Sequence, residues 1–334
     1  MGKNAIEVRH LKKYFKVLQK ETGLVGSFKS LIARKYEEVQ AINNIDFTIR
    51  EGELVGFIGP NGAGKTTTLK CLSGLLYPTS GEARVLGFIP WERRPEFQKQ
   101  FGLVMGQKNQ LWWDLPPMET FTLNKEIYEV PDGQFQQTLK RLVRLLDVGG
   151  ILKTQVRKLS LGQRMKCELI AALLHSPKVL FLDEPTIGLD VVMQKVMRDF
   201  IKEYNREFKA TIILTSHYMD DVRELCERVI IINEGTILYD GKLQEVVNRF
   251  AREKIITVVF SSSIDQRKLA EFGNIREYEF PKAQLTVPRT EAAKKAAKLL
   301  EEFPVADVVI EEPPIEAIIR EVFTGRMKPF QKPK

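Results

Sequence analysis

Apolar residues along most of this chain fall into short continuous runs separated by stretches with helical spacing. The nearly continuous runs predict buried strands at 53–59, 178–184 and 211–217. Shorter strands are expected at 4–10, 41–50 and 101–106, and a hairpin at about 228–240. Helical patterns lie at about 65–73, 117–129, 133–147, 162–175 and 190–207. Strands that alternate with helices in this way favour an α/β fold with a parallel sheet.

Residues 16–40 separate the first two predicted strands. The middle of this insert carries apolar residues at helical spacing on a basic background, namely Leu24, Phe28, Leu31 and Ile32. Two interpretations are open: a surface hairpin or loop insertion, or an amphipathic segment that faces a partner or a membrane.

The pattern changes near residue 250. Residues 255–325 read as strand, helix, strand, strand, helix, strand and helix, which predicts a small α+β appendage. We therefore expect two domains, one over 1–250 and an accessory one over 251–334, in agreement with a length of 334 residues.

Composition and charge indicate the cellular environment of the chain, but they do not select one function. The net charge of +8 is compatible with nucleic acid, nucleotides or an anionic membrane surface. Cys71, Cys167 and Cys226 are far apart, so neither a disulfide framework nor a zinc site is supported, and a reducing cytoplasmic setting fits. Residues 1–20 are too charged for a signal peptide, and no apolar run approaches the roughly 20 residues that span a bilayer.

A glycine-rich segment follows the strand predicted at 53–59. "GPNGAGKT" at 59–66 matches the phosphate-loop pattern with a strand before it and a helix after it. Such a loop turns backbone N–H groups inward, and the helix N-terminus adds positive potential, so a polyphosphate is held. We expect Lys65 to reach the β and γ phosphates, Thr66 to place its hydroxyl on Mg²⁺ and Thr67 to lie near the α phosphate. The other loop residues expected to contact nucleotide are Gly59, Asn61, Gly62, Ala63 and Gly64.

Two carboxylates end the strand predicted at 178–184. Asp183 is expected to hold Mg²⁺ beside the phosphate loop. Glu184 follows it where the chain turns, so both carboxylates can face the site, and Glu184 is a candidate general base. His217 ends the neighbouring strand, where the crevice of a doubly wound sheet lies, and we expect it to hydrogen-bond the γ phosphate.

The ordered set of motifs resembles the nucleotide-binding subunits of ABC transporters. It consists of the phosphate loop at 59–66, "LSLGQ" at 159–163, "FLDEP" at 181–185, "GLD" at 188–190 and "TSH" at 215–217. The resemblance covers about residues 4–245. It implies a P-loop NTPase fold of the ABC type, with a mixed sheet core, an antiparallel β subdomain and a helical subdomain at about 107–176.

The resemblance also explains the "LSLGQ" turn, which carries no catalytic chemistry of its own. In the family two subunits pair head to tail, and this turn caps the γ phosphate bound to the other subunit. Ser160, Gly162 and Gln163 match the contacting positions. Leu161 stands where the usual pattern has glycine, so the shape of the local backbone is the open point.

Further roles follow from the resemblance residue by residue. Gln107 matches the glutamine that touches Mg²⁺ and the attacking water, and Asp190 matches the aspartate that communicates between subunits. Family spacing selects Phe15 to stack on adenine, with Tyr14 as the close alternative. The segment with Trp112 and Trp113 corresponds to the face that meets the membrane subunit, although core packing of these rings is the alternative.

The resemblance implies an ATPase with ATP and Mg²⁺ as cofactors, acting as a homodimer on the cytoplasmic face of the membrane. Its partners are separate permease subunits, and the long insert and the C-terminal appendage resemble a drug- or polymer-exporter branch. Two alternatives are a nucleic-acid-associated ATPase of the same superfamily and a regulatory module without hydrolysis. Against the first, no long coiled coil, second ATPase domain or zinc cluster is present; against the second, Glu184, Gln107 and His217 are intact.

Overall fold

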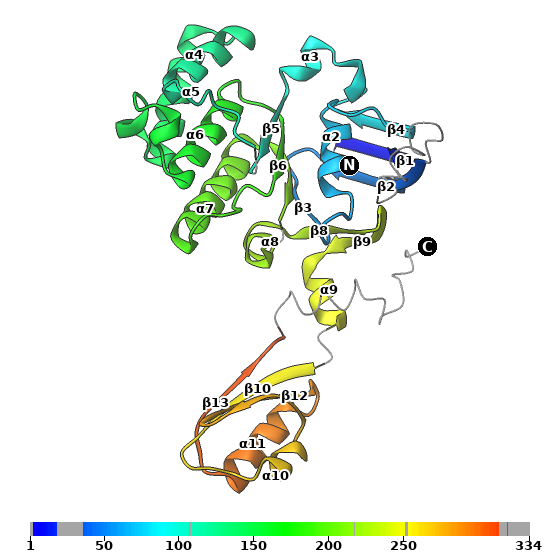
Figure 1. Ribbon diagram of the computed structural model, residues 1–334, viewed down its shortest axis with the longest axis vertical. Coiled ribbons are helices and arrows are strands. Elements are labelled where there is room, and N and C mark those ends of the chain that lie inside the picture. Colours follow the sequence, from blue (N-terminus) through cyan, green and yellow to red (C-terminus); the bar gives the residue numbers. More distant parts are fainter. Residues whose placement is uncertain are drawn as a thin grey trace, which may run out of the picture. The chain divides into compact units, whose positions relative to one another are not determined.

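The computed structural model describes residues 3–18, 36–106, 108–216, 218–250, 253–313 and 319 (Figure 1). The chain divides into two compact units, the first containing 1–241 together with 330–334 and the second covering 242–329. Each unit is described by itself. Among the described residues, no helix has both the length and the apolar character needed to cross a membrane.

A six-stranded sheet forms the centre of the first unit. Its strand order is β5 (Phe101–Met105), β6 (Val179–Asp183), β7 (Thr211–Thr215), β3 (Leu54–Ile58), β8 (Arg228–Asn233) and β9 (Thr236–Lys242). The pairs from β5 to β8 are parallel. Every residue of β6 and β7 is buried, as their continuous apolar runs predict. The carboxyl ends of these strands therefore share one edge of the sheet.

A second, antiparallel sheet has the order β2 (Tyr36–Arg50), β1 (Asn4–Leu18) and β4 (Ser80–Val85). Strands β1 and β2 run further than predicted and pair along the flanks of the insert, with Phe15 opposite Val39. Residues 19–35, the middle of the insert, lie outside the described residues. The short β4 was not expected, because only two of its residues are buried, Ala83 and Val85.

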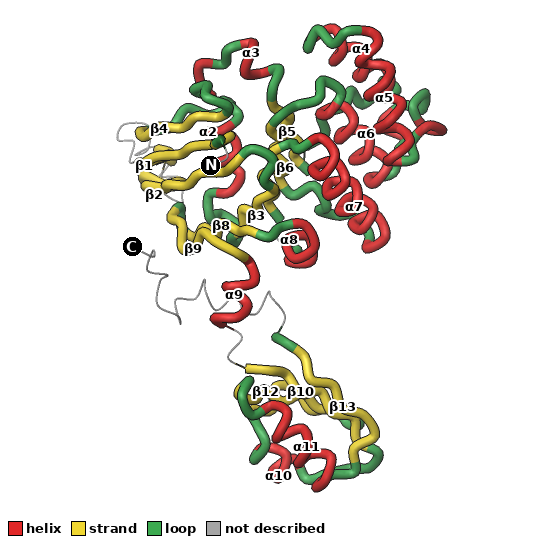
Figure 2. The backbone as a smooth tube through the Cα atoms, turned by 180° about the vertical axis from the view of Figure 1, so that it is seen from behind, coloured by secondary structure: helices red, strands yellow, loops and turns green. Residues whose placement is uncertain are grey.

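The predicted helices are present with small shifts at their ends. They are α2 (Lys65–Leu72), α4 (Pro117–Ile127), α5 (Asp132–Leu146), α6 (Leu161–Leu173) and α7 (Val191–Phe208). Two short helices, α3 (Pro95–Gln98) and α8 (Met219–Leu225), were not expected. Helices α4, α5 and α6 gather beyond the β5 side of the sheet (Figures 1 and 2). The mixed sheet core, the antiparallel sheet and the helical subdomain agree with the expected fold.

One apolar core joins the two sheets of the first unit. It contains residues of all three antiparallel strands, the central sheet and α2, including Ile6, Phe47, Phe57 and Leu69. Close packing of this kind fixes the ends of β3 and β6, from which the candidate site is built.

All three cysteines are buried thiols without a disulfide. Burial raises the pKa of Cys71 to about 11 and that of Cys167 to about 12, and it raises the pKa of Cys226 as well. Because the thiolate is the reactive form, these cysteines are protonated and unreactive near neutral pH.

The second unit begins with α9 (Leu243–Phe250) and contains an antiparallel sheet of order β11-β12-β10-β13. Its elements are β10 (Glu253–Phe260), α10 (Gln266–Ala270), β11 (Asn274–Glu279), β12 (Lys282–Pro288), α11 (Ala292–Glu302) and β13 (Val305–Glu311). This βαββαβ order is that of the ferredoxin-like motif. The unit has its own core, to which Val258, Leu285 and Leu299 belong. The helix expected at 314–325 lies outside the described residues apart from Ile319.

Candidate functional site

The phosphate loop connects β3 to α2, and close backbone contacts explain its glycines. A Cβ on Gly59 would lie 2.2 Å from the carbonyl oxygen of Ile232, and one on Gly64 would lie 2.3 Å from that of Ala41. Gly64 also has φ +106°, which favours glycine. As the N-cap of α2 it provides no side-chain cap, so the first N–H groups of the helix remain available to an anion.

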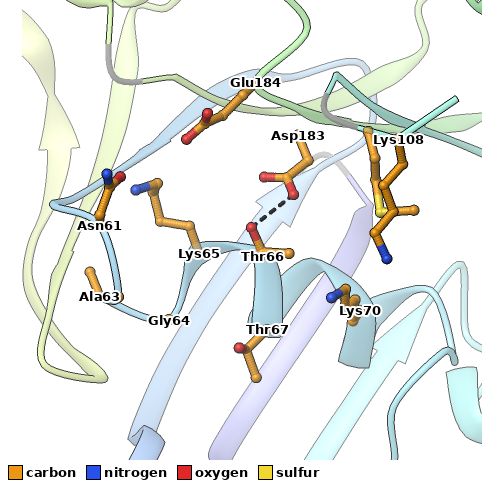
Figure 3. Close-up of a pocket in the computed structure, with 12 residues that line it drawn as sticks. Asn61, Ala63, Gly64, Lys65, Thr66, Thr67, Lys70, Lys108, Asp183 and Glu184 are labelled. Carbon is orange, nitrogen blue, oxygen red and sulfur yellow. Dashed lines mark hydrogen bonds between the residues drawn. The ribbon is translucent and has the colours of Figure 1, made fainter. Parts of the chain in front are cut away.

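A cavity of about 460 Å³ opens beside this loop (Figure 3). Its lining brings together the predicted Asn61, Gly62, Ala63, Gly64, Lys65, Thr66, Thr67, Asp183 and Glu184. Three more residues line it that the sequence did not single out, Lys70, Met105 and Lys108. The only sequence signal for the two lysines is their positive charge. Lys70 lies about one helical turn after the loop, and Lys108 follows Gln107 in the sequence.

Lys65 lies within the loop and is 6% exposed. Its Nζ donates to the carbonyl oxygens of Gly59 at 2.6 Å and Pro60 at 3.0 Å, which uses two of its three donors. Burial lowers the pKa of Lys65, while the nearby Glu184 and Asp183 raise it. The side chain is therefore held at the base of the cavity with a donor left for a phosphate oxygen.

Asp183 ends β6 and accepts two short hydrogen bonds. Thr66 Oγ1 donates to its Oδ2 at 2.8 Å, and Thr215 Oγ1 on β7 donates to its Oδ1 at 2.6 Å. The Thr66 hydroxyl and the Asp183 carboxylate are hard oxygen donors on the cavity wall (Figure 3). Mg²⁺ prefers one or two carboxylates together with substrate phosphates, so this donor set fits it.

Glu184 has a positive φ of 54°, which is uncommon for a residue with a side chain. Its N–H donates to the carbonyl oxygen of Thr215 at 3.0 Å, and its own carbonyl oxygen would lie 2.1 Å from a Cβ on Gly106. The strand therefore turns sharply here, so both Asp183 and Glu184 line the cavity although they are adjacent in sequence (Figure 3). Strain of this kind is common at functional sites.

The "LSLGQ" turn forms the N-terminus of α6, which begins at Leu161, one residue earlier than expected. Ser160 Oγ accepts from the N–H of Gln163 at 3.2 Å, and Gln163 Oε1 accepts from the N–H of Ser160 at 3.0 Å. This is a capping box. Gly162 faces Met193 so closely that a Cβ would lie 2.9 Å from that side chain. A Cβ on Gly188 would lie 3.1 Å from Leu161 Cδ2, and the cap forms with leucine in place of the usual glycine.

None of the capping residues lines the cavity. Ser160 is exposed, and its cap uses an oxygen lone pair, so no described residue accepts its O–H hydrogen. Asp190 is also exposed and caps α7, with the N–H of Met193 donating to its Oδ1 at 2.8 Å. Ser160 and Asp190 therefore lie on the surface of the subunit, outside its own cavity.

Among the described residues, the predicted Gly59, Phe15 and Tyr14 do not line the cavity. Phe15 lies on β1, half-buried, with the Lys13 ammonium 4.9 Å from its ring centroid. Tyr14 donates its hydroxyl to Asn43 Oδ1 at 3.0 Å. Gln107 and His217 lie outside the described residues. Trp112 and Trp113 are 59% and 49% exposed, which favours a surface role over core packing.

Comparisons with known proteins agree with this geometry. A family model described as "ABC transporter" matches residues 42–187, and one described as "EvrA-like ABC transporter, C-terminal domain" matches 252–311. The ABC transporter ATP-binding protein NatA of Bacillus subtilis is 31% identical over 230 residues, which cover 69% of this chain and 93% of that protein. The linearmycin resistance ATP-binding protein LnrL of the same organism is 27% identical, covering 88% and 97%.

Solved structures show the same fold. The structure of an ATP-binding subunit of an ABC transporter has a TM-score of 0.60 at 23% identity and covers 74% of this chain and 93% of its own. A dimeric post-hydrolysis state of the ATP-binding cassette MJ0796 bound to ADP and Pi has a TM-score of 0.59 at 21% identity, covering 71% and 98%. Together with the NatA match, the fold and the cavity identify this chain as a member of the ABC transporter family, among its ATP-binding and ATP-hydrolysing subunits.

Proposed function

We propose that two copies of this chain pair head to tail and enclose ATP between them. One observation carries this proposal. The lysine loop, Asp183 and Glu184 share one cavity, whereas Ser160 with its unused hydroxyl donor lies outside it on an exposed helix N-terminus. A second copy would bring that donor and the positive end of α6 to the γ phosphate.

Within each cavity, different residues have different roles in binding and hydrolysis. Lys65 and the first N–H groups of α2 hold the phosphates, and Thr67 lies nearest the α phosphate. Thr66, Asp183 and Gln107 are the residues that would hold Mg²⁺, which supplies positive charge to the phosphate oxygens when bound. Glu184 accepts a proton from the attacking water, His217 donates to the γ phosphate, and Phe15 stacks on adenine.

The enclosed nucleotide explains how hydrolysis can drive movement. ATP contacts both subunits only in the closed pair, so it binds that state more tightly than the open one. Loss of the γ phosphate removes the contact with Ser160 and Gly162 of the other copy. Asp190, exposed beside the same turn, passes the change between subunits.

The membrane partner is a separate permease, and the ATPase lies on the cytoplasmic face of the membrane. Exposed apolar residues after β5 and on α4 support this assignment, namely Trp112, Trp113, Leu115, Leu123 and Ile127. Large aromatic anchors of this kind are typical of interfaces. The names of the relatives favour transport over a nucleic-acid-associated role.

We also propose export as the direction. The linearmycin resistance protein LnrL is covered over 97% of its own length, and a probable multidrug ATP-binding protein, YbhF of Escherichia coli, is 35% identical over 211 residues. The methionine import ATP-binding protein MetN 2 of Enterococcus faecalis, 27% identical over 94% of this chain, is the contrary case that the transport experiment addresses. Purification with the product of a neighbouring reading frame, followed by transport in vesicles with this ATPase outside, measures both partner and direction. Uptake into such vesicles supports export, and release from them contradicts it.

The decisive test of the nucleotide pair is Glu184→Gln with ATP and Mg²⁺. Because the amide cannot accept the proton, turnover should fall by about 10²-fold or more, and the protein should accumulate as a dimer by light scattering. Glu207→Gln on α7, far along the chain from the cavity lining, serves as the control and should keep turnover. A Glu184→Gln protein that hydrolyses ATP normally, or that stays monomeric at every concentration, contradicts the proposal.

A further inference from the structure

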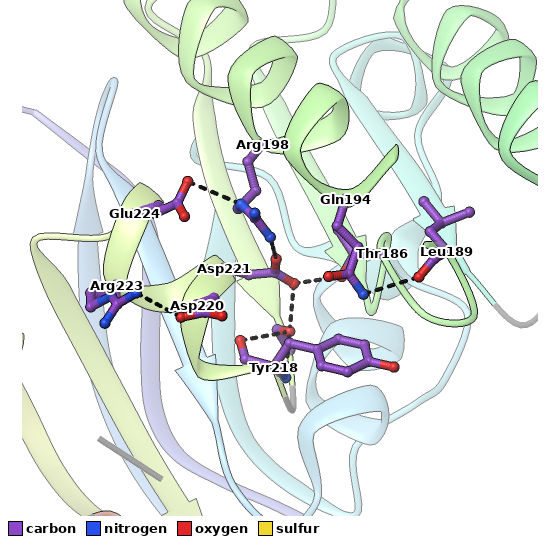
Figure 4. A network of polar contacts seen from close by, with 10 residues as sticks. Thr186, Leu189, Gln194, Arg198, Tyr218, Asp220, Asp221, Arg223 and Glu224 are labelled. Atoms are coloured by element: carbon purple, nitrogen blue, oxygen red, sulfur yellow. Dashed lines mark hydrogen bonds and ion pairs between the residues drawn. The ribbon is translucent and has the colours of Figure 1, made fainter. Parts of the chain in front are cut away.

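Among the described residues of the first unit, Asp221 is the most enclosed carboxylate, and the function proposed above does not use it. It is 0% exposed and lies in the first turn of α8. Three side chains from different elements donate to it: Thr186 at 2.5 Å, Ser216 at 2.8 Å and Arg198 at 3.0 Å (Figure 4). All three donors are buried as well.

Two of these donors belong to the segments that carry functional residues. Thr186 lies two residues after Glu184, in the loop between β6 and α7. Ser216 follows β7 and directly precedes His217 in the sequence. Both donate to the same oxygen of Asp221, Oδ2. The carboxylate therefore joins the segments that follow two neighbouring parallel strands.

Further hydrogen bonds within each segment connect the residue held by Asp221 to the residues that follow it. The N–H of Leu189 donates to the carbonyl oxygen of Thr186 at 3.2 Å, and Asp190 comes next and caps α7. On the other side, the N–H of Tyr218 donates to Ser216 Oγ at 3.0 Å, so the residues flanking His217 are tied together. A shift of Asp221 would thus move both loops.

Arg198 holds the carboxylate in place from α7. Its Nη1 contacts Asp221, and its Nε donates to Glu224 at 3.0 Å (Figure 4). A buried charge pair of this kind has few alternative arrangements, because breaking it leaves an uncompensated charge in the interior. The Arg198–Asp221 pair therefore acts as a rigid support for the two hydroxyl groups.

We propose that Asp221 is a positioning residue that fixes the loop of His217 and the loop from Glu184 to Asp190 relative to each other. This rests on the function proposed above, in which both loops meet the nucleotide. The carboxylate contacts neither substrate nor metal in this account. It sets the geometry in which Glu184 and His217 act, and so it affects turnover rather than nucleotide binding.

Deleting the two hydroxyls separately and together provides the test, because these changes leave the Arg198–Asp221 charge pair intact. Thr186→Val and Ser216→Ala should each lower kcat about 10-fold or more, since a misplacement of about 1 Å can cost about 10²-fold. The KM for ATP should stay within about 2-fold of the wild-type value, because the phosphate loop is untouched. The double variant should lose less than the product of the two single losses, since both hydroxyls act through one carboxylate.

Conservative changes and a neighbouring residue supply the controls. Thr186→Ser and Ser216→Thr keep a hydroxyl and should restore most of kcat. Asp220→Asn removes the carboxylate next in sequence, which is exposed and pairs with Arg223 at 2.8 Å, and should behave as wild type. Melting temperatures are measured for all variants.

The outcomes separate this inference from the function on which it rests. If wild-type protein hydrolyses ATP but both hydroxyl deletions keep full kcat, the role of Asp221 is refuted and the function stands. The role is also refuted if the loss of kcat in the variants is explained by a lower melting temperature. It is refuted as well if the kcat loss of the double variant equals the full product of the two single losses. If Glu184→Gln neither slows turnover nor forms dimers, the proposed function itself has failed.

Discussion

At the residue scale, two polar side chains of the cavity, Lys65 and Asp183, are held by hydrogen bonds to neighbouring protein groups. Lys65 lies on two carbonyl oxygens of its own loop, and Asp183 accepts from two threonine hydroxyls. Each side chain therefore has a fixed position before nucleotide enters. Preorganisation of this kind lowers the entropy cost of binding.

For Lys65→Ala we expect ATP affinity to fall by about 10²-fold, because truncating one partner of a buried charge pair costs about 2–5 kcal/mol. Equilibrium binding of ATP to the purified chain measures this. Lys140→Ala, an exposed lysine of α5, is the matched control. Equal affinity in the two variants would refute the assignment of Lys65.

Glu168 is a buried acid of α6 outside the cavity. It is 1% exposed, with the Gln110 N–H 3.4 Å and Arg164 Nε 3.7 Å from its Oε1. Burial raises its pKa from 4.5 to about 7, against smaller opposing effects of Gln110 and Arg164. The native chain therefore binds a proton between these pH values that the unfolded chain releases, so the free energy of unfolding falls as the pH rises through this window.

Glu168→Gln should remove this pH dependence. Above pH 7 the variant should be more stable than wild type by about 1–3 kcal/mol, because one pKa unit corresponds to about 1.4 kcal/mol. At pH 4.5 the two proteins should be nearly equal. Urea unfolding at a series of pH values measures the difference, and parallel curves for the two proteins would contradict the raised pKa.

At the element scale, the end of β6 depends on the neighbouring end of β5. Gly106 approaches the carbonyl oxygen of Glu184 so closely that a Cβ would lie 2.1 Å away. Its N–H also donates to the carbonyl oxygen of Asp183 at 2.9 Å. The turn that brings Glu184 to the cavity therefore requires glycine directly after the adjacent strand.

Gly106→Ala should displace Glu184 and lower kcat about 10²-fold, in line with the cost of a misplacement of about 1 Å. Gly133→Ala is the control, since a Cβ there meets nothing within 4 Å and the residue lies in α5. That control should be stabilised by about 0.5–1 kcal/mol. ATPase assays and thermal unfolding of both variants measure these effects, and normal turnover in Gly106→Ala would contradict them.

Much of the element order could be predicted because it follows from local pattern. The strands β3, β6 and β7 are buried on both faces and read as continuous apolar runs, and helices such as α5 and α7 show clear periodicity. The phosphate loop was recognisable because its chemistry lies in one contiguous segment. In the second unit, β10 to β13 with α10 and α11 are all confirmed.

Other features depend on contacts between distant segments and could not be predicted from local sequence patterns. Strand β4 and helix α8 are short and carry few apolar residues, so no period is visible. The donors to Asp221 come from positions up to 35 residues away in the sequence. Lys70 and Lys108 reach the cavity only because α2 and the segment after β5 meet there. The roles of the site residues stay predictions until the variants are measured.

At the scale of the whole molecule, the two compact units have separate cores. Separate cores are the condition under which units unfold as independent cooperative transitions. Only the first unit contains the nucleotide cavity. Nucleotide should therefore stabilise one unit directly and leave the other unchanged.

Calorimetry of the Glu184→Gln chain should show two transitions. ATP with Mg²⁺ at about 100 times its Kd should stabilise one of them by about 2.7 kcal/mol and leave the other in place. Leaving out Mg²⁺ should reduce the shift, because Thr66 and Asp183 then lack the ion between them and the phosphates. A single transition that moves as a whole would show that the units unfold together.

The three buried thiols have a practical consequence for fluorescent labelling of this ATPase. A maleimide probe that needs an accessible thiolate should leave the native protein unlabelled near neutral pH. A cysteine introduced at Val191, which is 77% exposed next to Asp190, would then be the single labelled position. A fluorophore there would report approach and separation of two copies in real time, without first removing any natural cysteine.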